Sequence, residues 1–157
     1  MTDLNKSILF IGNFLSAWGM NQGISKDLHE RFSDKGWKVA YSSTHRNKVL
    51  RLMDMMLTAI RQRNHYQVAN IDVFSDKAFI IAEVMSLVFN LLKKPVVGTL
   101  RGGHLVGFSE QNPKRVRRVL RRLTKITTPS LYLRDHFSEI RDDIIRIPNG
   151  VDLESYP

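Results

Sequence analysis

Cysteine is absent from this 157-residue sequence, and its absence excludes several kinds of site together. A chain without thiols has no disulfide framework, no thiolate zinc site and no cysteine nucleophile. Long hydrophobic runs are also missing, because the longest apolar stretch, residues 78–92, is interrupted by Glu83, Ser86 and Asn90. A spanning helix needs roughly 20 apolar residues, so we expect no membrane-spanning helix. The first residues lack the apolar core of a signal peptide, and we expect a cytoplasmic protein.

Acidic residues are few relative to basic ones, with 15 Asp and Glu against 24 Lys and Arg and a net charge of +9. This excess favours anionic partners such as phosphate groups, nucleic acid or an acidic membrane surface. Hydrophobic residues make up 43% of the chain and charged residues 25%, which is typical of a folded protein. The length suits one unit, so we predict a single domain over residues 1–157.

Short apolar runs predict six β-strands. They lie at residues 7–11, 37–43, 66–74, 95–100, 125–128 and 144–147. Helical patterns separate them, and the predicted helices lie near residues 24–35, 48–63, 76–93, 114–123 and 131–138. A parallel strand needs a helical return over one face of the sheet, so this alternation predicts an α/β fold. We expect a Rossmann-like three-layer sandwich with a mainly parallel sheet.

Several helices carry more detailed signals. The segment 48–63 has a broad apolar face, formed by Val49, Leu52, Met53, Met56, Leu57 and Ile60. The segment 76–93 is apolar apart from one polar stripe, so we expect it to be mostly buried against a sheet face. Asn112 followed by Pro113 predicts a helix start at which the Asn side chain caps free amides, and Ser130 predicts another cap.

Glycine-bearing loops follow the first and fourth predicted strands, and ligands of open α/β sheets bind beyond the carboxyl ends of strands. The first loop contains Gly19 and Gly23, where backbone amides could approach a phosphate or a sugar. It matches neither the dinucleotide fingerprint nor the phosphate-loop pattern, so it does not support a nucleotide-binding assignment. A turn that only connects two elements explains the same glycines.

Metal and nucleophile signatures are missing as well. No Asp-x-Asp pair occurs, and the five histidines show no ligand spacing on one helix face, so we predict no bound metal. No nucleophile-elbow sequence is present, which leaves a hydrolase triad without support.

A basic helix is the most unusual local feature. No Asp or Glu lies between Glu110 and Asp135, whereas the predicted helix carries Arg115, Arg118 and Arg122 among its cations. An apolar stripe would dock this helix on the fold and leave the cations facing anions, such as an acidic membrane surface or a lipid phosphate. A solvated basic face is the alternative. No aromatic residue is interleaved to stack on bases, so we do not expect nucleic acid as a partner.

Motifs in four regions give the sequence a family resemblance. The last segment reads Ile-Pro-Asn-Gly-Val-Asp over residues 147–152, with Tyr-Pro following at 156–157. Upstream of it lie the glycine loop after the first strand, Pro-Val-Val-Gly-Thr-Leu-Arg-Gly-Gly at 95–103 and Thr-Pro-Ser-Leu-Tyr-Leu at 128–133. Together these motifs resemble the N-terminal domain of glycosyltransferase family 4 enzymes, which have the two-domain GT-B fold.

The resemblance implies metal-independent retaining transfer of a sugar, without a cofactor, from a nucleotide-sugar donor to a saccharide or lipid-linked acceptor. Polysaccharide, lipopolysaccharide and glycolipid synthesis are all compatible with it. The glycines expected to border donor or acceptor are Gly19, Gly23, Gly102 and Gly103. Family members bind most of the donor with a C-terminal domain that is missing from this chain, so we expect no meaningful turnover from the chain alone. Asn149 and Gly150 would form the hinge into that domain, and the basic helix would attract the inner face of a membrane.

One position departs from the family pattern. Many members have a His just before the glycine that follows the fourth strand, where this sequence has Arg101, with His104 three residues later. Arg101 could bind a charged donor or acceptor group, or His104 could reach the site along a different loop path. A third interpretation is that Arg101 only ties the loop down.

Two further interpretations of the whole chain stay open. The charge of +9 and the basic helix also suit a stand-alone, non-catalytic anion-binding α/β module. The chain could also be one subunit of a naturally split enzyme whose donor domain is a separate subunit. The sequence specifies neither the donor sugar nor the acceptor.

Overall fold

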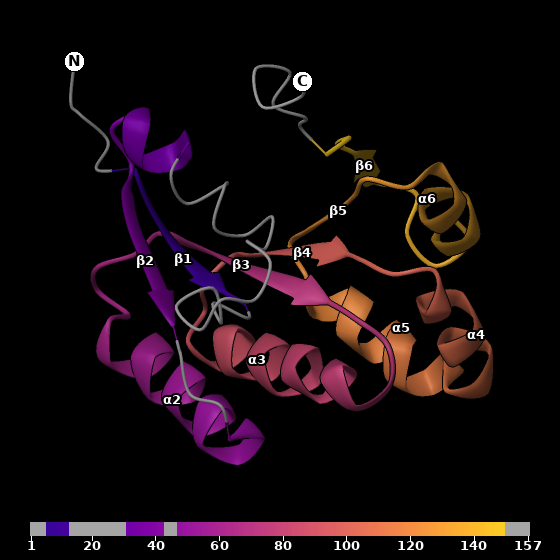
Figure 1. Ribbon diagram of the computed structural model, residues 1–157, viewed down its shortest axis with the longest axis horizontal. Helices are drawn as coiled ribbons and strands as arrows, with labels where there is room; N and C mark the ends of the chain where they lie inside the picture. Colours follow the sequence, from indigo (N-terminus) through magenta and orange to yellow (C-terminus); the bar gives the residue numbers. More distant parts are fainter. Residues whose placement is uncertain (1–5, 13–30, 43–46, 150–157) are drawn as a thin grey trace, which may run out of the picture.

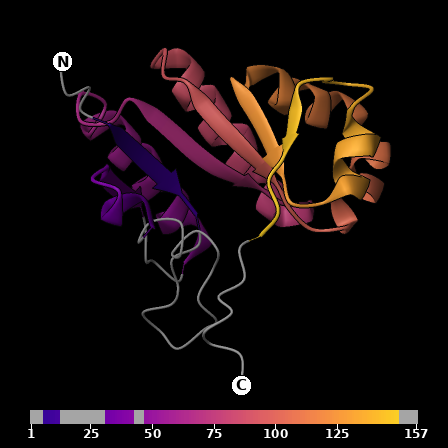
Figure 2. The ribbon, with the colours of Figure 1, turned by 90° about the horizontal axis from the view of Figure 1, so that it is seen from above.

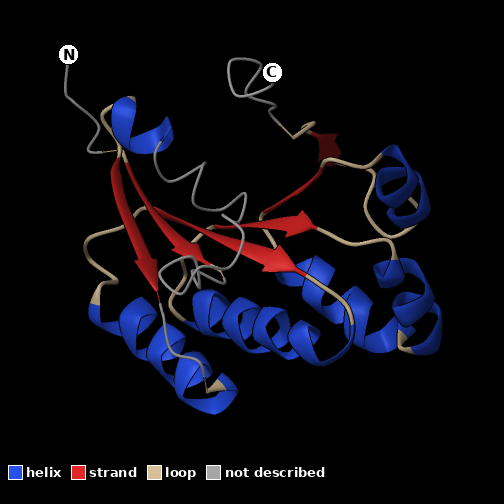
Figure 3. Ribbon diagram, viewed as in Figure 1, coloured by secondary structure: helices blue, strands red, loops and turns tan. Residues whose placement is uncertain are grey.

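The computed structural model of the chain describes residues 6–12, 31–42 and 47–149. Six strands form one sheet in the order β2-β1-β3-β4-β5-β6, and every neighbouring pair is parallel (Figure 1, Figure 3). The strands are β1 (Ser7–Ile11), β2 (Lys38–Ser42), β3 (Val68–Val73), β4 (Val96–Leu100), β5 (Lys125–Thr128) and β6 (Ile144–Arg146). Each lies within its predicted range, so the predicted α/β fold with a parallel sheet is confirmed.

Helices lie on both faces of the sheet, as in a Rossmann-like three-layer sandwich. The helices are α2 (Lys48–Arg61), α3 (Phe79–Leu91), α4 (His104–Gln111), α5 (Pro113–Arg122) and α6 (Leu131–Phe137), and a short 3₁₀ helix, η2 (Asp76–Ala78), leads into α3. On one face, here called the helix face, α2, α3 and α5 lie side by side (Figure 1). Residues 31–34 are helical and lie on the other side, here called the open face (Figure 2).

The main core fills the space between the sheet and the helix face. Its fully buried side chains include Phe79, Met85 and Phe89 of α3, together with Leu9 and Ile71 of the central strands. Among the described residues, the apolar cluster on the open face is much smaller. It is formed by Ile8 and Phe10 with Phe32, Trp37, Val39 and Val68.

A glycine allows close packing between β4 and the end of α5. A Cβ added at Gly98 would lie 2.3 Å from Cδ1 of Leu123, a side chain that is itself buried. Any larger residue at this position would displace Leu123, so Gly98 fixes how closely this segment approaches the sheet.

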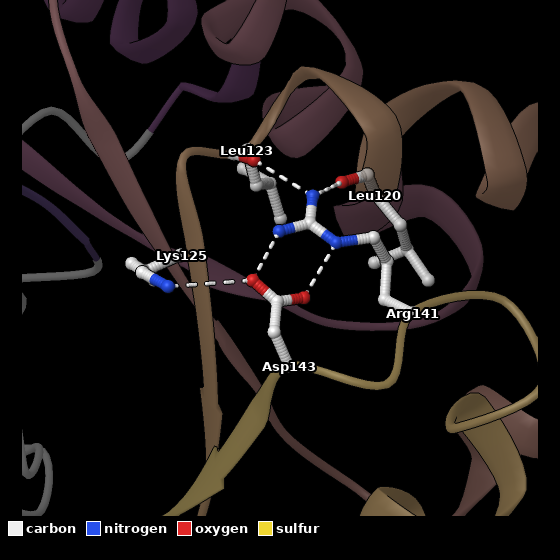
Figure 4. A network of polar contacts seen from close by, with 5 residues as sticks. All are labelled: Leu120, Leu123, Lys125, Arg141 and Asp143. Carbon is white, nitrogen blue, oxygen red and sulfur yellow. Dashed lines mark hydrogen bonds and ion pairs between the residues drawn. The ribbon is translucent and has the colours of Figure 1, made fainter.

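A polar network holds the C-terminal end of α5 (Figure 4). Arg141 donates two hydrogen bonds of 2.6 Å to the carboxylate of Asp143, and it donates two more to the carbonyl oxygens of Leu120 and Leu123 at 3.1 and 3.0 Å. These bonds satisfy carbonyls that a helix end leaves free and place positive charge at the negative end of the helix dipole. The guanidinium of Arg141 lowers the pKa of Asp143 to about 2.

The segment between β4 and the basic helix contains a helix that the sequence prediction omitted. Residues 104–111 form α4, which buries Leu105, Val106 and Ser109. Gly107 in the middle of this helix weakened the helical signal, because glycine is a poor helix former.

The predicted helix caps are right in one case and wrong in the other. The Oγ of Ser130 accepts a hydrogen bond of 3.3 Å from the Leu133 N–H, as a cap should. The Asn112 side chain does not cap α5, although Pro113 begins that helix as predicted. Instead, Nδ2 of Asn112 donates to the Phe108 carbonyl at 3.2 Å and so closes α4.

The apolar patterns of α2 and α3 do not mark their buried faces. In α2 the buried side chains are Met55 and Ala59, whereas most of the predicted apolar face is exposed. In α3, Ser86 of the predicted polar stripe is fully buried, and Leu87 and Leu91 are exposed instead. Both helices therefore carry apolar side chains on two sides.

Candidate functional site

The path of the chain changes direction at β1, which makes a switch point in the sheet. β2 lies on one side of β1, and β3 to β6 follow in order on the other. The loops beyond the carboxyl ends of β1 and β3 therefore part, and open α/β sheets bind ligands at such points. Gly12 follows β1, Asp72 lies near the end of β3, and Arg101 follows β4 at the same edge.

A buried ion pair joins β3 and β4 at this edge. The Nε of Arg101 lies 2.6 Å from Oδ1 of Asp72, and the two side chains are only 11% and 9% exposed. The Arg101 N–H also donates to the Val73 carbonyl at 3.0 Å. Arg101 therefore ties the loop after β4 to β3. Both charged groups are largely buried, and a buried ion pair of this kind is costly to break.

Two hollows flank this ion pair. Arg101 lines a groove of about 350 Å³ that extends over the open face of the sheet, here called the open-face groove. Asp72 lines a smaller hollow of about 110 Å³, together with Gly12 and Phe74. The pair thus contributes a cation to one hollow and a carboxylate to the other. The volume of the open-face groove lies within the range of small-molecule sites.

The open-face groove combines an apolar floor with a few polar side chains. Its apolar lining consists of Ile8, Phe10, Phe32, Val97, Pro129, Ile147 and Pro148. Its polar lining consists of Asn70, Thr99, Arg101, Thr127 and Asn149. Strands of parallel sheets are usually apolar on both sides because helices cover both faces. Polar side chains on this face therefore indicate a surface that meets water or a ligand.

Three of these polar side chains form a hydrogen-bonded row across β3, β4 and β5. The Thr99 hydroxyl donates to Oδ1 of Asn70 at 3.4 Å, and it lies 3.0 Å from the Thr127 hydroxyl. A hydroxyl has one proton, so Thr127 is the donor to Thr99 when Thr99 donates to Asn70. The row then presents amide donors of Asn70 at one end and acceptor lone pairs of Thr127 at the other.

The turn after Arg101 brings backbone to the edge of this site. Gly102 has a φ of +83°, a conformation that favours glycine, and the Leu105 N–H donates to the Gly102 carbonyl at 3.2 Å. A Cβ at Gly102 or Gly103 would meet no atom within 4 Å. His104 begins α4 and is exposed. The two glycines therefore leave open space next to the backbone.

The structure brings some of the predicted site residues together. Arg101 and Asn149 line the same groove, although they come from distant motifs of the sequence. Gly102, Gly103 and His104 follow Arg101 directly. Three predicted residues lie outside the described part of the chain: Gly19, Gly23 and Gly150.

The predicted anion patch lies away from the groove, on α5 in the helix face. The guanidinium of Arg115 donates to both carboxylate oxygens of Glu83, at 3.0 and 2.5 Å. It also lies 5.7 Å from the ring centres of Phe79 and Phe108. Arg115 thus joins α3, α4 and α5, and its hydrogen bonds lower the pKa of Glu83. This side chain is engaged in packing.

The other two predicted members of the patch differ in exposure. Arg118 is exposed, and Arg122 is half-buried on the same helix. The exposed cations of α5 are Lys114, Arg117, Arg118 and Arg121. A cationic surface therefore remains on α5 without Arg115.

Another hollow, of about 410 Å³, lies at the amino ends of β1, β2 and β3. Its polar groups serve the packing there: the Tyr66 hydroxyl donates to the Ala59 carbonyl at 2.9 Å, and Nζ of Lys94 donates to the Tyr66 carbonyl at 2.9 Å. Burial raises the pKa of Tyr66 to about 12. Because this hollow lies at the opposite end of the strands from the switch point, we place the candidate site at the open-face groove.

Sequence reasoning missed Asp72 and the polar row. The signal was present as polar residues at alternate positions of predicted strands, namely Asn70 with Asp72 and Thr99 with Arg101. Alternate residues of a strand share one face, so this spacing indicates a polar stripe on an otherwise apolar sheet. The cross-strand register, which places Asp72 opposite Thr99 and Thr99 opposite Thr127, was the missing information.

No group of three or more His, Cys, Asp or Glu side chains that could hold a metal ion occurs among the described residues. Within the same residues, no helix is long and apolar enough to cross a membrane. No protein-family model matches the chain, and a comparison with curated proteins finds no match. Fold and groove together define the class: an α/β protein with an all-parallel sheet and a ligand-sized groove beside its switch point.

Proposed function

We propose that this chain is the acceptor-side domain of a retaining, metal-independent glycosyltransferase that uses a nucleotide-sugar donor. One observation carries the proposal: three sequence motifs that are far apart in the chain line one groove. Arg101 comes from the motif at 95–103, Pro129 from the motif at 128–133, and Asn149 from the last motif. Motifs that share no local structure but meet at one groove support a common ligand.

The chemistry of the groove suits a saccharide. A sugar ring has an apolar side and a rim of hydroxyl groups, and ligand sites commonly combine apolar walls with a few placed polar groups. Phe10 and Val97 provide the apolar floor, and the row from Asn70 to Thr127 provides donors and acceptors at its two ends. The acceptor is therefore assigned to the open-face groove.

Transfer would occur where the acceptor meets the donor at the carboxyl edge of the sheet. The bond from the sugar C1 to the diphosphate oxygen breaks, a bond from C1 to the acceptor oxygen forms, and the acceptor proton leaves with the released nucleotide diphosphate. Arg101 places a cation in the groove at this edge, and fixed positive charge stabilises a departing diphosphate. Asp72 holds that guanidinium in place.

The donor nucleotide would be bound chiefly by a second domain, as the family resemblance implies. The chain alone then binds acceptor without transferring sugar. The direct test is a transfer assay on the longest natural form of the gene product, with a panel of nucleotide sugars and chromatographic detection of released nucleotide diphosphate. Release that requires residues beyond Pro157 supports the proposal, and robust transfer by the 157-residue chain contradicts it.

The roles of Arg101 and His104 are separable in the same assay. Arg101→Ala should lower kcat/KM by about 100-fold, because it removes the cation that lines the groove. His104→Ala should change kcat/KM less than about threefold, because this exposed side chain does not line the groove. Asp72→Asn tests how much the positioning of Arg101 matters, because the cation stays in the chain while its partner loses the negative charge. We expect a higher KM or a lower kcat. A full rate in the Arg101→Ala variant contradicts the assigned role.

A second candidate function is a non-catalytic anion-binding module, which the exposed cations of α5 favour. It predicts that pyrophosphate binds the 157-residue chain and that Arg117→Glu weakens this binding. The transferase proposal instead predicts saccharide binding that Thr99→Val weakens and Arg117→Glu leaves unchanged. Ligand titrations followed by NMR distinguish the two.

A further inference from the structure

Helix α2 carries an exposed apolar stripe along its whole length. The stripe consists of Val49, Leu50, Met53, Leu57 and Ile60, which are between 42% and 67% exposed. Successive residues of an α-helix are rotated by about 100°, so these five side chains fall within a sector of about 100°. The buried residues Met55 and Ala59 lie on the opposite side of the helix. The stripe therefore points directly away from the sheet.

Helix α3 repeats this arrangement. Its exposed apolar side chains are Ile80, Leu87 and Leu91, between 42% and 73% exposed. They share one side of the helix, opposite the fully buried Met85 and Phe89, by the same helical rotation. Isolated exposed apolar side chains are ordinary, but two neighbouring stripes with the same orientation need an explanation.

Helix α5 presents charge in the same direction. Its exposed cations are Lys114, Arg117, Arg118 and Arg121, opposite the buried Val116, Val119 and Leu120. There is no acidic residue in α5. The acidic residues of α2 and α3 are Asp54, which lies beside the apolar stripe, and Glu83, which is bound to Arg115. Helix α4, which also contacts α5, adds the exposed Glu110. Among the described residues, no ion pair joins the four exposed cations of α5 to any of these carboxylates.

The three stripes form one surface. Because α2, α3 and α5 lie side by side on the helix face, side chains opposite their buried residues share one outward direction (Figure 1). We call this surface the outer face and define it by the exposed apolar residues of α2 and α3 and the four exposed cations of α5. It is apolar over two helices and cationic over the third.

We propose that the outer face binds an anionic lipid bilayer, with α2 and α3 parallel to the membrane and the cations of α5 at the phosphate groups. Charge complementarity favours this occupant, because basic residues next to an apolar helical face gain from both lipid tails and acidic headgroups. A second copy of the chain would set the cations of α5 against either the same cations or the apolar stripes, and neither arrangement supplies them with opposite charge.

The proposal is independent of the proposed sugar transfer. The open-face groove lies over the opposite side of the sheet from the outer face, so lipid binding leaves the groove accessible. Failure of lipid binding would leave the transfer assay unaffected, and failure of the transfer assay would leave lipid binding unaffected.

The test is co-sedimentation of the 157-residue chain with vesicles. Vesicles of phosphatidylcholine with about 30% phosphatidylglycerol should bind the chain at least about tenfold more strongly than pure phosphatidylcholine vesicles at low salt. Raising the salt to about 0.5 M should remove most of this difference, because the charge contribution is screened.

Two variants, each with a matched control, test the apolar part and the cationic part of the outer face. Leu57→Glu should lower binding to the anionic vesicles by about tenfold, because it places a carboxylate in the apolar stripe. Ile145→Glu is its control, because Ile145 is similarly exposed but its neighbour Ile144 faces the core, so Ile145 points to the open face. Arg121→Glu should also weaken binding. Its matched control is Arg31→Glu, because Arg31 is an exposed cation of the helical residues 31–34 on the open face.

Three results would overturn the proposal. One is absence of binding to anionic vesicles at low salt, and another is an equal loss of binding in Leu57→Glu and Ile145→Glu. The third is a dimer in analytical ultracentrifugation that Leu57→Glu converts to a monomer, with no vesicle binding by either form. That last result would assign the outer face to a second copy of the chain.

Discussion

The two faces of the sheet differ in how the chain covers them. On the helix face, α2, α3 and α5 bury a continuous core that includes Phe79, Met85 and Phe89. On the open face, a small cluster around Phe10 gives way to a groove with a polar row. The same strands supply both faces, because alternate residues point in opposite directions. Among the described residues, the larger buried apolar cluster therefore lies on the helix face, and the polar row and its groove lie on the open face.

The largest expected effect tests where the stability lies. Phe89→Ala should lower the free energy of unfolding by about 3–5 kcal/mol, because it leaves a cavity in a fully buried part of the main core. Phe10→Ala should cost about half as much, because its side chain borders a groove into which neighbours and water can relax. Urea unfolding of both variants measures the two values. Equal losses would contradict the division between the two faces.

A smaller effect is expected at the close contact between β4 and Leu123. Gly98→Ala should lower the free energy of unfolding by about 1–2 kcal/mol, because the added methyl group overlaps with the Leu123 side chain. Leu123→Ala in the same chain should remove this penalty. Gly103→Ala is the control at the candidate site and should lie within about 0.5 kcal/mol of the parent, since its Cβ meets no atom. If Gly98→Ala also destabilises a chain that carries Leu123→Ala, the steric explanation is wrong.

The ion pair between Arg141 and Asp143, at the end of α5, makes the free energy of unfolding depend on pH in the acid range. The pKa of Asp143 falls from 3.8 to about 2 on folding, mainly through its hydrogen bonds to Arg141. A carboxyl group with a lowered folded-state pKa stabilises the protein above its unfolded pKa, and this contribution is lost as pH falls toward the folded value. Asp143→Asn should therefore weaken the loss of stability between pH 4 and pH 2. Thermal unfolding across that interval measures it, and an unchanged acid dependence would contradict the assignment.

The smallest expected effect on stability lies in the polar row of the open face. Thr99→Val removes a hydroxyl that joins Asn70 and Thr127, and it should change the free energy of unfolding by less than about 1.5 kcal/mol. Saccharide binding to the same variant should fall by about tenfold, because the row loses its central link. A large loss of stability with unchanged binding would assign the row to folding instead of recognition.

The strands could be predicted from the sequence because each is a short apolar run bounded by turn residues. β5 illustrates this, since its four residues agree with the predicted range. Helix α4 was missed because Gly107 interrupts a short pattern. The buried side of α2 was also unpredictable from periodicity, because the larger apolar side chains lie on the outer face while Met55 and Ala59 pack inward.

The candidate site was predictable in part. Arg101 could be selected because it replaces a motif residue, and Asn149 could be selected as part of the final motif. Their meeting in one groove depends on the order of β1, β3, β4 and β5, which no local pattern encodes. The partner of Arg101, Asp72, required the cross-strand register. The sequence predicted Arg115 as part of an anion patch. Its contact with Glu83 could not be predicted, because that contact joins two helices.

The central claim is that the chain supplies the acceptor side of a sugar transfer, with Arg101 at its groove. The most direct measurement is the release of nucleotide diphosphate by the longest natural form of the gene product, compared between the parent and Arg101→Ala. The account predicts release that depends on an added acceptor, falls by about 100-fold in the variant and is missing from the 157-residue chain. Release by the variant at the parent rate, or no release with any donor, would contradict it.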